Sequence, residues 1–463
     1  MESALRVPTR RESWLYAIAN LGGSIPYQAF GAVVLFYYTD VKQLSPAVAA
    51  LIMSIYAIWN AVNNPIIGHI SDRTNTKWGR RLPYIRFGAI PYAIAFALIW
   101  LAPFDGKTQP TELAIWFLVT IIVFEGLGTA VSMAGHLALL PEMFPTYKSR
   151  LDVAVRMNWI QTTGLFVGAA LPPILASILG YPLMGIVFAV VACAAYFIGL
   201  QGMFEQPNYQ PTPVKFVDAI KHTVVNRSFV SVMMAQMMRF VATNTLTSGM
   251  FFYVKYSLNA DPAQTTIILA TAFVAAGLYL PLWRKYIAQP LGPRTSLMIA
   301  YASIGLAVIP LYFVQDVNFA LVVAGIEVIP PYFVQSFNVA LVAAAIIGFP
   351  VAGMIMLGDV IMSDVIDEDE MRNGSRREAM FFAVNGAAVA LSSTIAATAF
   401  GIISTMYGYN PLLDVQPQSV DQGFRVYMIF LPIIGAICAV TALSFYPLYG
   451  ERLRAIRAFA QRD

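Results

Sequence analysis

Four ionisable side chains lie inside long apolar stretches of this chain, at Glu125, Arg156, Arg239 and Asp359. An ionised side chain at the centre of a bilayer costs at least about 2.5–3.5 kcal/mol on insertion scales, so such residues are candidates for function. A carboxyl group there can take up and release a proton, and a guanidinium group can donate hydrogen bonds to a polar solute. The chemistry indicated is therefore the binding of a solute and the movement of a proton.

Glu125 is the first candidate for a proton carrier, and Asp359 is the second. Ser132 and His136 follow Glu125 by 7 and 11 residues, which predicts that the three side chains share nearly one helix face. In a second, structural interpretation, Glu125 pairs with the first of the two intramembrane arginines and Asp359 with the second, and these ion pairs fix helix packing. The two interpretations are not exclusive.

Polar side chains in the same apolar stretches are candidates for binding the solute. Arg156 and Trp159 share a helix face, and such a pair suits a hydroxylated ring through donor bonds to hydroxyls and stacking on the apolar side. The other candidates are Ser24, Tyr27 and Gln28 in the first stretch, Arg239 in the seventh and Asn385 in the eleventh. Helix packing through small polar residues explains the first-stretch group equally well.

The composition excludes an ordinary water-soluble protein. Of 463 residues, 58% are hydrophobic and 12% are charged, with a mean hydropathy of +0.65, whereas a soluble domain carries about 25% charged residues. A membrane-spanning helix needs about 20 mostly apolar residues. Twelve such windows lie at about 13–38, 46–70, 83–103, 113–141, 153–178, 181–203, 229–257, 262–283, 295–314, 339–363, 379–406 and 424–447.

The basic residues predict the orientation of the chain. Lys and Arg of short loops are retained on the cytoplasmic side, and almost all of them fall on one side if the N-terminus is inside. Both termini are then cytoplasmic in a multi-pass protein of the cell membrane. We expect two six-helix halves at 1–203 and 229–463, joined by a cytoplasmic linker at 204–228. No cleaved signal peptide is predicted, because no small-residue cleavage site precedes the first apolar stretch.

The short loop after the second window has the sharpest motif, Asn-Pro-Ile-Ile-Gly-His-Ile-Ser-Asp-Arg at 64–73 and Lys-Trp-Gly-Arg-Arg at 77–81. It resembles the signature loop of the major facilitator superfamily. In this interpretation Gly68 permits close helix approach, and the charges pair with helix ends when the inner face is closed. A basic stop-transfer loop is the alternative. The residues assigned to this gating loop are Gly68, Asp72, Arg73, Gly79, Arg80 and Arg81.

Further motifs resemble the glycoside–pentoside–hexuronide:cation symporter family over nearly the whole chain. They are Tyr-Tyr-Thr-Asp at 37–40, Ile-Trp-Asn-Ala-Val-Asn-Asn-Pro at 58–65, Pro-Glu at 141–142, Asn-Arg-Ser-Phe at 226–229 and Asp-Val-Ile-Asp at 364–367. The resemblance implies an all-α integral membrane fold of twelve transmembrane helices, alternating access, and a sugar or glycoside as the solute. It also implies that Arg156 contacts the substrate.

The chain departs from that family at the implied cation site. The family usually has two Asp residues four positions apart, and here the residues are Asn60 and Asn64. The spacing keeps both on one helix face, but neutral amides offer only carbonyl oxygens to a cation and cannot take up a proton. Sodium coupling at this place is doubtful, and proton coupling through the pair is excluded. We therefore expect transport that is proton-coupled through another group or uncoupled.

Residues 307–326 and 327–346 form a tandem copy that matches at 13 of 20 positions. A thirteenth crossing would move the basic residues at 372–377 to the outside, against the positive-inside pattern. We expect the segment from Asp316 to Asn338 to protrude or re-enter on the outer side, with Pro330 and Pro331 breaking its helix. A neutral duplication without a function is the alternative.

Several classes of function are not predicted. The sequence has no GxxxxGK[ST] loop, HExxH motif, nucleophile elbow or Cys/His ligand set, so we expect neither an enzyme nor a metal site or cofactor. The basic loops follow the topology and do not indicate nucleic-acid binding. The expected partners are a small-molecule substrate and the lipid bilayer, with a monomer as the default. Two alternative functions stay open: a lysophospholipid-type carrier, and a sensor or assembly protein on the same fold.

Overall fold

The computed structural model describes residues 6–144, 147–206, 226–313, 336–373, 378–413 and 415–460. Within these ranges the regular structure is helical, apart from an isolated β-bridge between Thr76 and Gly79. The side chains of Asp72 and Asp359 are outside the description. The chain forms two compact units, Met1–Pro213 and Val214–Asp463. The predicted all-helical architecture is confirmed.

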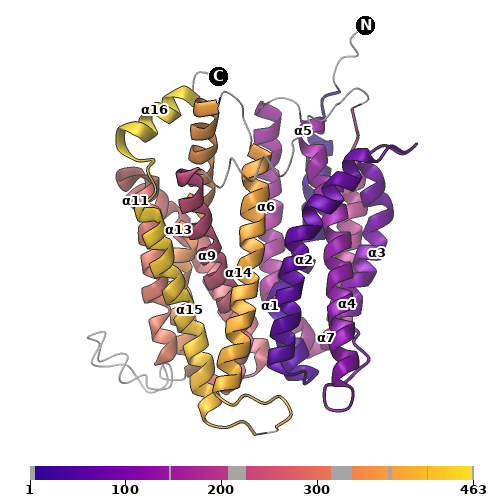
Figure 1. Cartoon of the computed structure of the whole chain (residues 1–463), viewed down its shortest axis with the longest axis vertical. Coiled ribbons are helices and arrows are strands. Elements are labelled where there is room, and N and C mark those ends of the chain that lie inside the picture. The colour runs from indigo at the N-terminus through magenta and orange to yellow at the C-terminus, as the bar shows by residue number, and fades with distance from the viewer. Residues whose placement is uncertain are drawn as a thin grey trace. The chain divides into compact units, whose positions relative to one another are not determined.

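The first unit is a bundle of long helices that lie side by side (Figure 1). α1 begins with a capping box, in which Thr9 and Glu12 exchange hydrogen bonds with each other's backbone N–H groups. Five other helices begin with Pro in the first two positions, where its missing N–H costs nothing. The helices are α1 Arg10–Phe36, α2 Pro46–Arg73, α3 Leu82–Trp100, α4 Pro110–Thr129, α5 Leu140–Met143, α6 Tyr147–Ala170 and α7 Pro172–Leu200.

The second unit has the same general construction. α9 begins at Asn226, whose side chain accepts from the N–H groups of Ser228 and Phe229. Its helices are α9 Arg227–Phe252, α10 Thr265–Leu282, α11 Gln289–Ala307, α13 Ser336–Asn373, α14 Glu378–Met406, α15 Ser419–Ser444 and α16 Gly450–Ala460. Residues 314–335 lie outside the described residues, so the expected protrusion of the duplicated segment stays a prediction.

Two long helical stretches contain sharp breaks at glycine. Gly180 in α7 has φ 78° and ψ 159°, and Gly292 in α11 has φ 75° and ψ 167°. Side chains with a Cβ rarely adopt this conformation, so glycine is required at both breaks. Each break therefore divides one continuous helical stretch into two separate helices.

The first helix of each unit ends in the same way. α1 runs into the wide π-turn η1, Tyr37–Val41, and α9 runs into η4, Tyr253–Ser257. Tyr37 donates to the carbonyl of Trp100, and Tyr253 donates to the carbonyl of Leu311. After each turn a residue other than glycine takes a positive φ, Gln43 at 62° and Asn259 at 50°.

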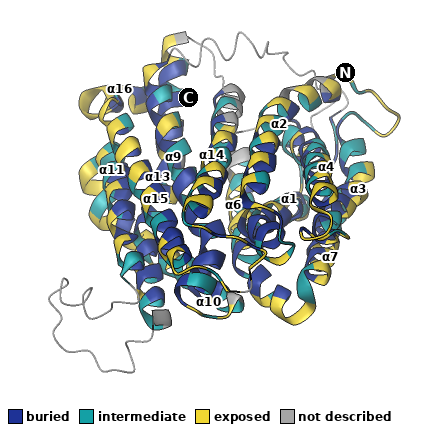
Figure 2. Ribbon diagram, turned by 60° about the horizontal axis from the view of Figure 1, so that its bottom comes forward, coloured by how far each residue is buried: buried dark blue, intermediate teal, exposed yellow. Residues whose placement is uncertain are grey.

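The described residues contain eight stretches that are long and apolar enough to cross a membrane. Many apolar side chains of these helices are buried and many others are exposed. Figure 2 shows buried and exposed residues along the same helices. The stretch Thr265–Tyr312 holds both α10 and α11. Helices α1, α6 and α9 are longer than 18 residues but are not among the eight, because they carry more polar side chains. Such helices suit contact with a polar interior better than contact with lipid.

Candidate functional site

Glu125 occupies an enclosed position in α4, where it is 8% exposed. The hydroxyl of Tyr56 in α2 donates a 2.6 Å hydrogen bond to Oε2 of Glu125. Asn63 of α2 donates to the backbone carbonyl of Glu125 at 3.3 Å and to Oγ1 of Thr129 at 2.8 Å. Among the described residues Glu125 forms no ion pair with Arg156, so that predicted pair is wrong. The site is a single carboxyl group held by neutral donors.

Asn60 and Asn64 face each other along α2. Nδ2 of Asn64 lies 3.5 Å from Oδ1 of Asn60, at the limit of a hydrogen bond. The described residues contain no group of three or more His, Cys, Asp or Glu side chains that could hold a metal ion. Sequence reasoning missed Asn63, which stands between the two and makes the contacts to α4. Its position in the same Asn-rich motif was the available signal.

His136 does not continue a polar stripe from Glu125. The π-turn η2, Ala130–His136, follows α4 and interrupts the 3.6-residue period on which that prediction depends. Nε2 of His136 lies 2.9 Å from the carbonyl of Tyr16, and the Tyr16 hydroxyl donates to the carbonyl of His136 at 2.8 Å. His136 is 1% exposed, so it joins α1 to the end of this helical stretch. The expectation that Glu125 and His136 share a helix face is therefore wrong.

The first-stretch candidates pack against α6. An added Cβ at Gly164 would collide with the hydroxyl of Ser24, and one at Gly168 would lie 2.8 Å from Cβ of Gln28. Glycine at these positions allows α1 and α6 to approach closely. The packing interpretation therefore explains Ser24 and Gln28, whereas Tyr27 is partly exposed.

Arg156 in α6 lies against a ring that sequence reasoning did not assign. Its Cζ is 5.7 Å from the ring centroid of Trp14 in α1. Trp159, the predicted partner, is 70% exposed one turn further along α6. The pair of α1 and α6 thus presents two indole rings beside one guanidinium group.

In the second unit, Arg239 of α9 has its Cζ 4.3 Å above the ring of Phe240. Among the described residues neither Nε of Arg239 nor Oδ1 of Asn385 in α14 has a hydrogen-bond partner, and both atoms are buried. Asn244 of α9 donates a 3.0 Å hydrogen bond to Oγ of Ser393 in α14, which joins the two helices. The predicted pairing of Arg239 with Asp359 falls on a side chain outside the described residues.

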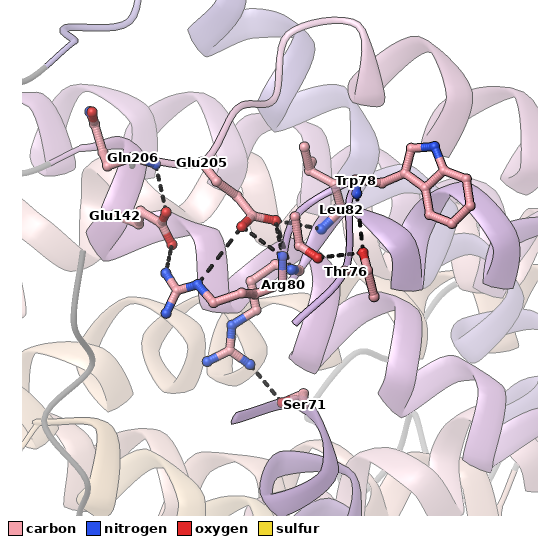
Figure 3. A network of polar contacts seen from close by, with 10 residues as sticks. Ser71, Thr76, Trp78, Arg80, Leu82, Glu142, Glu205 and Gln206 are labelled. Atoms are coloured by element: carbon pink, nitrogen blue, oxygen red, sulfur yellow. Dashed lines mark hydrogen bonds and ion pairs between the residues drawn. The ribbon is translucent and has the colours of Figure 1, made fainter. Parts of the chain in front are cut away.

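The gating loop is organised by Glu205, at the end of the first unit (Figure 3). Its carboxylate accepts the backbone N–H groups of Arg80, Arg81 and Leu82 at 2.7–2.9 Å. These are the otherwise unpaired donors at the beginning of α3, where a negative charge is favourable. Glu205 therefore caps α3 from a distant part of the chain, which no local sequence pattern indicated.

Glu142 continues this network from α5. It accepts the backbone N–H of Gln206 at 2.6 Å and a guanidinium N–H of Arg80 at 3.2 Å. Burial raises the pKa of the Glu142 carboxyl, although the Gln206 N–H and Arg80 oppose that shift. Arg81 in turn donates to Oγ of Ser71 in α2 at 2.6 Å. We call Glu205, Glu142, Arg80, Arg81 and Gln206 the inner clasp.

Two glycines of the gating loop have different roles. Gly79 has φ 106°, and an added Cβ there would collide with the Glu205 carboxylate. An added Cβ at Gly68 would meet nothing within 4 Å among the described residues, so the expected close helix approach at Gly68 stays a prediction. Arg73 is exposed at the end of α2.

The C-terminal end of α13 carries a second set of ion pairs. Arg457 of α16 binds both carboxylate oxygens of Asp364, each at 2.9 Å. This hydrogen bonding raises the pKa of the Arg457 guanidinium. Glu368 is fully buried and accepts from Arg452 at 2.6 Å and from Arg372 at 2.7 Å. Asp364 therefore joins α13 to α16.

Known proteins resemble this chain over nearly its full length. The isoprimeverose transporter of Lactiplantibacillus pentosus is 22% identical over 94% of this chain and 88% of its own. A glucuronide carrier protein homolog of Escherichia coli is 23% identical over 95% of this chain and 93% of its own. The sodium-dependent lysophosphatidylcholine symporter 1-A of Danio rerio is 22% identical over 95% of this chain and 86% of its own.

Solved structures of transporters share the fold. A bacterial homolog of the human lysosomal transporter Spinster matches with a TM-score of 0.60 at 15% identity, covering 98% of both chains. The nucleoside transporter NupG matches with a TM-score of 0.61 at 12% identity, covering 96% of this chain and all of NupG. The predictions of a multi-pass membrane location and a transport role, not an enzymatic one, are confirmed. Because the family model of MFS/sugar transport proteins matches residues 15–450, the chain belongs to that family.

Proposed function

We propose that the protein carries a sugar or glycoside across the membrane by alternating access, with a proton as the coupling ion. The full-length relatives that move isoprimeverose and, by name, glucuronides support the solute class. The observation that carries the coupling is the Glu125 carboxyl group, which neutral donors enclose at the middle of an apolar stretch. A buried carboxylate is costly to keep ionised, so a carboxyl group in such a place can bind and release a proton instead of holding a permanent charge.

The topology that we propose has twelve crossings with both termini in the cytoplasm. The break at Gly292 divides the stretch Thr265–Tyr312 into two segments, whereas the piece of α7 before Gly180 is too short to cross a membrane. When the polar helices α1, α6 and α9 are added to the apolar stretches, the chain has six crossings in each half. We expect the protein to be a monomer. The basic residues of the inner clasp and of α16 then lie on the cytoplasmic side.

Sodium is a weaker candidate at the Asn pair. Asn60 and Asn64 bring neutral amides together, and no carboxylate is present at either position. Sodium prefers several oxygen ligands that include negative charge, as hard cations do. We therefore expect a sodium gradient to have little effect on uptake, although one relative is named sodium-dependent.

Uptake into proteoliposomes tests this proposal. Labelled glucose, xylose and methyl β-glucoside would be offered under a proton gradient, a sodium gradient or neither. We expect accumulation only with the proton gradient, and only downhill flux in Glu125→Gln. Glu112→Gln is the matched control, because Glu112 is an exposed carboxylate in the first turn of the same helix. Equal downhill flux in all three conditions would show an uncoupled carrier, and sodium-driven uptake would overturn the assignment of Glu125.

A lysophospholipid-type carrier is the second candidate, and an apolar cavity in the second unit favours it. The cavity has a volume of about 60 Å³ and is lined almost entirely by apolar side chains, among them Leu246, Ile304, Ile347 and Met354. A groove of about 400 Å³ lies nearby on α10, α11 and α13, beside Leu306 and Phe349. Competition of lysophosphatidylcholine with sugar uptake would support this candidate. If neither solute moves, a non-transporting role on the same fold gains support.

A further inference from the structure

The first unit exposes an aromatic ring that has no role in the proposal above. Trp14, near the beginning of α1, is 40% exposed. The guanidinium group of Arg156 lies over this ring, with Cζ 5.7 Å from the centroid. Helices α1 and α6 pack along their length, so the two side chains are held on adjoining surfaces.

Arg156 needs a polar environment that the ring does not supply. Among the described side chains no carboxylate forms an ion pair with Arg156. A cation over an exposed ring contributes only about 0.5–1 kcal/mol, which does not replace the hydration that a guanidinium group loses in an apolar environment. Arg156 is therefore expected to face water or a polar ligand instead of lipid.

The surface of α6 beyond Arg156 agrees with this expectation. Trp159 is 70% exposed, and the polar residues around it are also exposed. Lipid-facing surfaces of membrane helices rarely carry such side chains. Arg156 thus lies at the border of a polar face, against Trp14 and one turn before the exposed Trp159. The exposed polar residues are Asn158, Gln161, Thr162 and Thr163.

We propose that Trp14 is a substrate-binding residue that selects ring-shaped sugars over open-chain polyols. A pyranose ring has C–H groups on a flat face and hydroxyls at its edge. When the face stacks on the indole of Trp14, the edge hydroxyls come within reach of the Arg156 donors. An open-chain polyol has the same hydroxyls but no flat apolar face. This inference rests on the proposed function, because it requires a sugar-like solute.

The test uses the full-length protein in proteoliposomes and the labelled pyranose or pyranoside that wild type takes up fastest in the panel above. The corresponding alditol serves as competitor. We expect Trp14→Leu to raise KM about tenfold while kcat changes less than twofold, and Trp14→Phe to stay within about threefold of wild type. Wild type should prefer the ring form over the alditol at least tenfold, and Trp14→Leu should lose most of that preference. A purely structural role would not change this ratio.

Tyr449→Leu is the matched control. Tyr449 is an exposed ring with Arg294 above it, 4.4 Å from the centroid, and Arg294 is held independently by the carbonyls of Leu443 and Ser444. Its KM and selectivity should equal those of wild type. If wild type transports the sugar, and Trp14→Leu keeps the ring preference with a KM within twofold of wild type, the inference about Trp14 is overturned and the proposed function stands. If wild type transports no sugar, the proposed function fails and the inference fails with it.

Discussion

Gly79 and Glu205 are in direct contact, because the Glu205 carboxylate occupies the space where a side chain at Gly79 would begin. The same carboxylate pairs with three consecutive N–H groups at the beginning of α3. Glycine at this position is therefore required twice, once for its positive φ and once for the approach of the cap.

Gly79→Ala should damage the protein, whereas Gly68→Ala should be tolerated. A positive φ in a residue with a Cβ costs about 1–2 kcal/mol, and displacement of the cap adds about 1 kcal/mol. We expect Gly79→Ala to unfold several degrees lower in detergent and to lose about tenfold in uptake. Gly68→Ala should match wild type in both, since a Cβ there meets nothing within 4 Å. Equal behaviour of the two variants would contradict this assignment.

The stability of the inner clasp should fall as the pH rises. Because burial raises the pKa of Glu142 in the folded protein above that of a free carboxyl, the folded state binds more protons between the two pKa values. The contribution of Glu142 to stability is then greatest below the ordinary carboxyl range and decreases as Glu142 ionises. Hydrogen exchange of the Arg80, Arg81 and Leu82 amides, corrected for intrinsic rates, should show protection that falls with rising pH. In Glu142→Gln this pH dependence should disappear.

Tyr56→Phe should weaken coupling without removing the carboxyl group. The variant deletes the 2.6 Å hydrogen bond to Glu125 and keeps the ring. A hydrogen bond to an ionised group contributes about 1.5–3 kcal/mol, so we expect proton-driven uptake to fall at least tenfold while downhill flux persists. Tyr38→Phe is the control, since Tyr38 bonds to the backbone carbonyl of Ile99. Unchanged proton-driven uptake in Tyr56→Phe would remove Tyr56 from the coupling mechanism.

Arg457→Gln should release α16 from α13. Arg457 is the bidentate partner of Asp364, which is buried in α13. A partly exposed ion pair contributes up to about 1 kcal/mol, and an unpaired buried carboxylate raises the loss to about 1–3 kcal/mol. Limited proteolysis should cleave α16 faster in this variant. Arg454→Gln, an exposed arginine of the same helix, should be cleaved at the wild-type rate.

The all-helical membrane architecture could be predicted from the sequence, because segments that cross a bilayer need about 20 mostly apolar residues and few other arrangements satisfy this. The gating loop was also recognisable, since Gly79, Arg80 and Arg81 are contiguous. Its partner Glu205 was not, because a cap supplied from the end of another helix leaves no local pattern. Long-range partners of this kind depend on packing, which the spacing of residues does not specify.

Within the candidate site, periodicity succeeded only where the helix is regular. The prediction that Glu125 is enclosed within α4 agrees with its burial. The placement of His136 on the same face was wrong because η2 is a wide turn, and no residue type in Ala130–His136 marks such a turn. Tyr56 was not assigned because nothing in the sequence around it indicates a partner on another helix, and only the structure shows its hydroxyl at Glu125.

The matching ends of α1 and α9 bear on the origin of the chain. A wide turn, a tyrosine at its first position and a bond from that tyrosine to a distant carbonyl occur together at both places. Independent evolution would require this combination to arise twice, whereas duplication of a half-length gene would require it to arise only once. The similar ends of α1 and α9 are the trace that duplication of a half-length unit would leave in a chain of two halves.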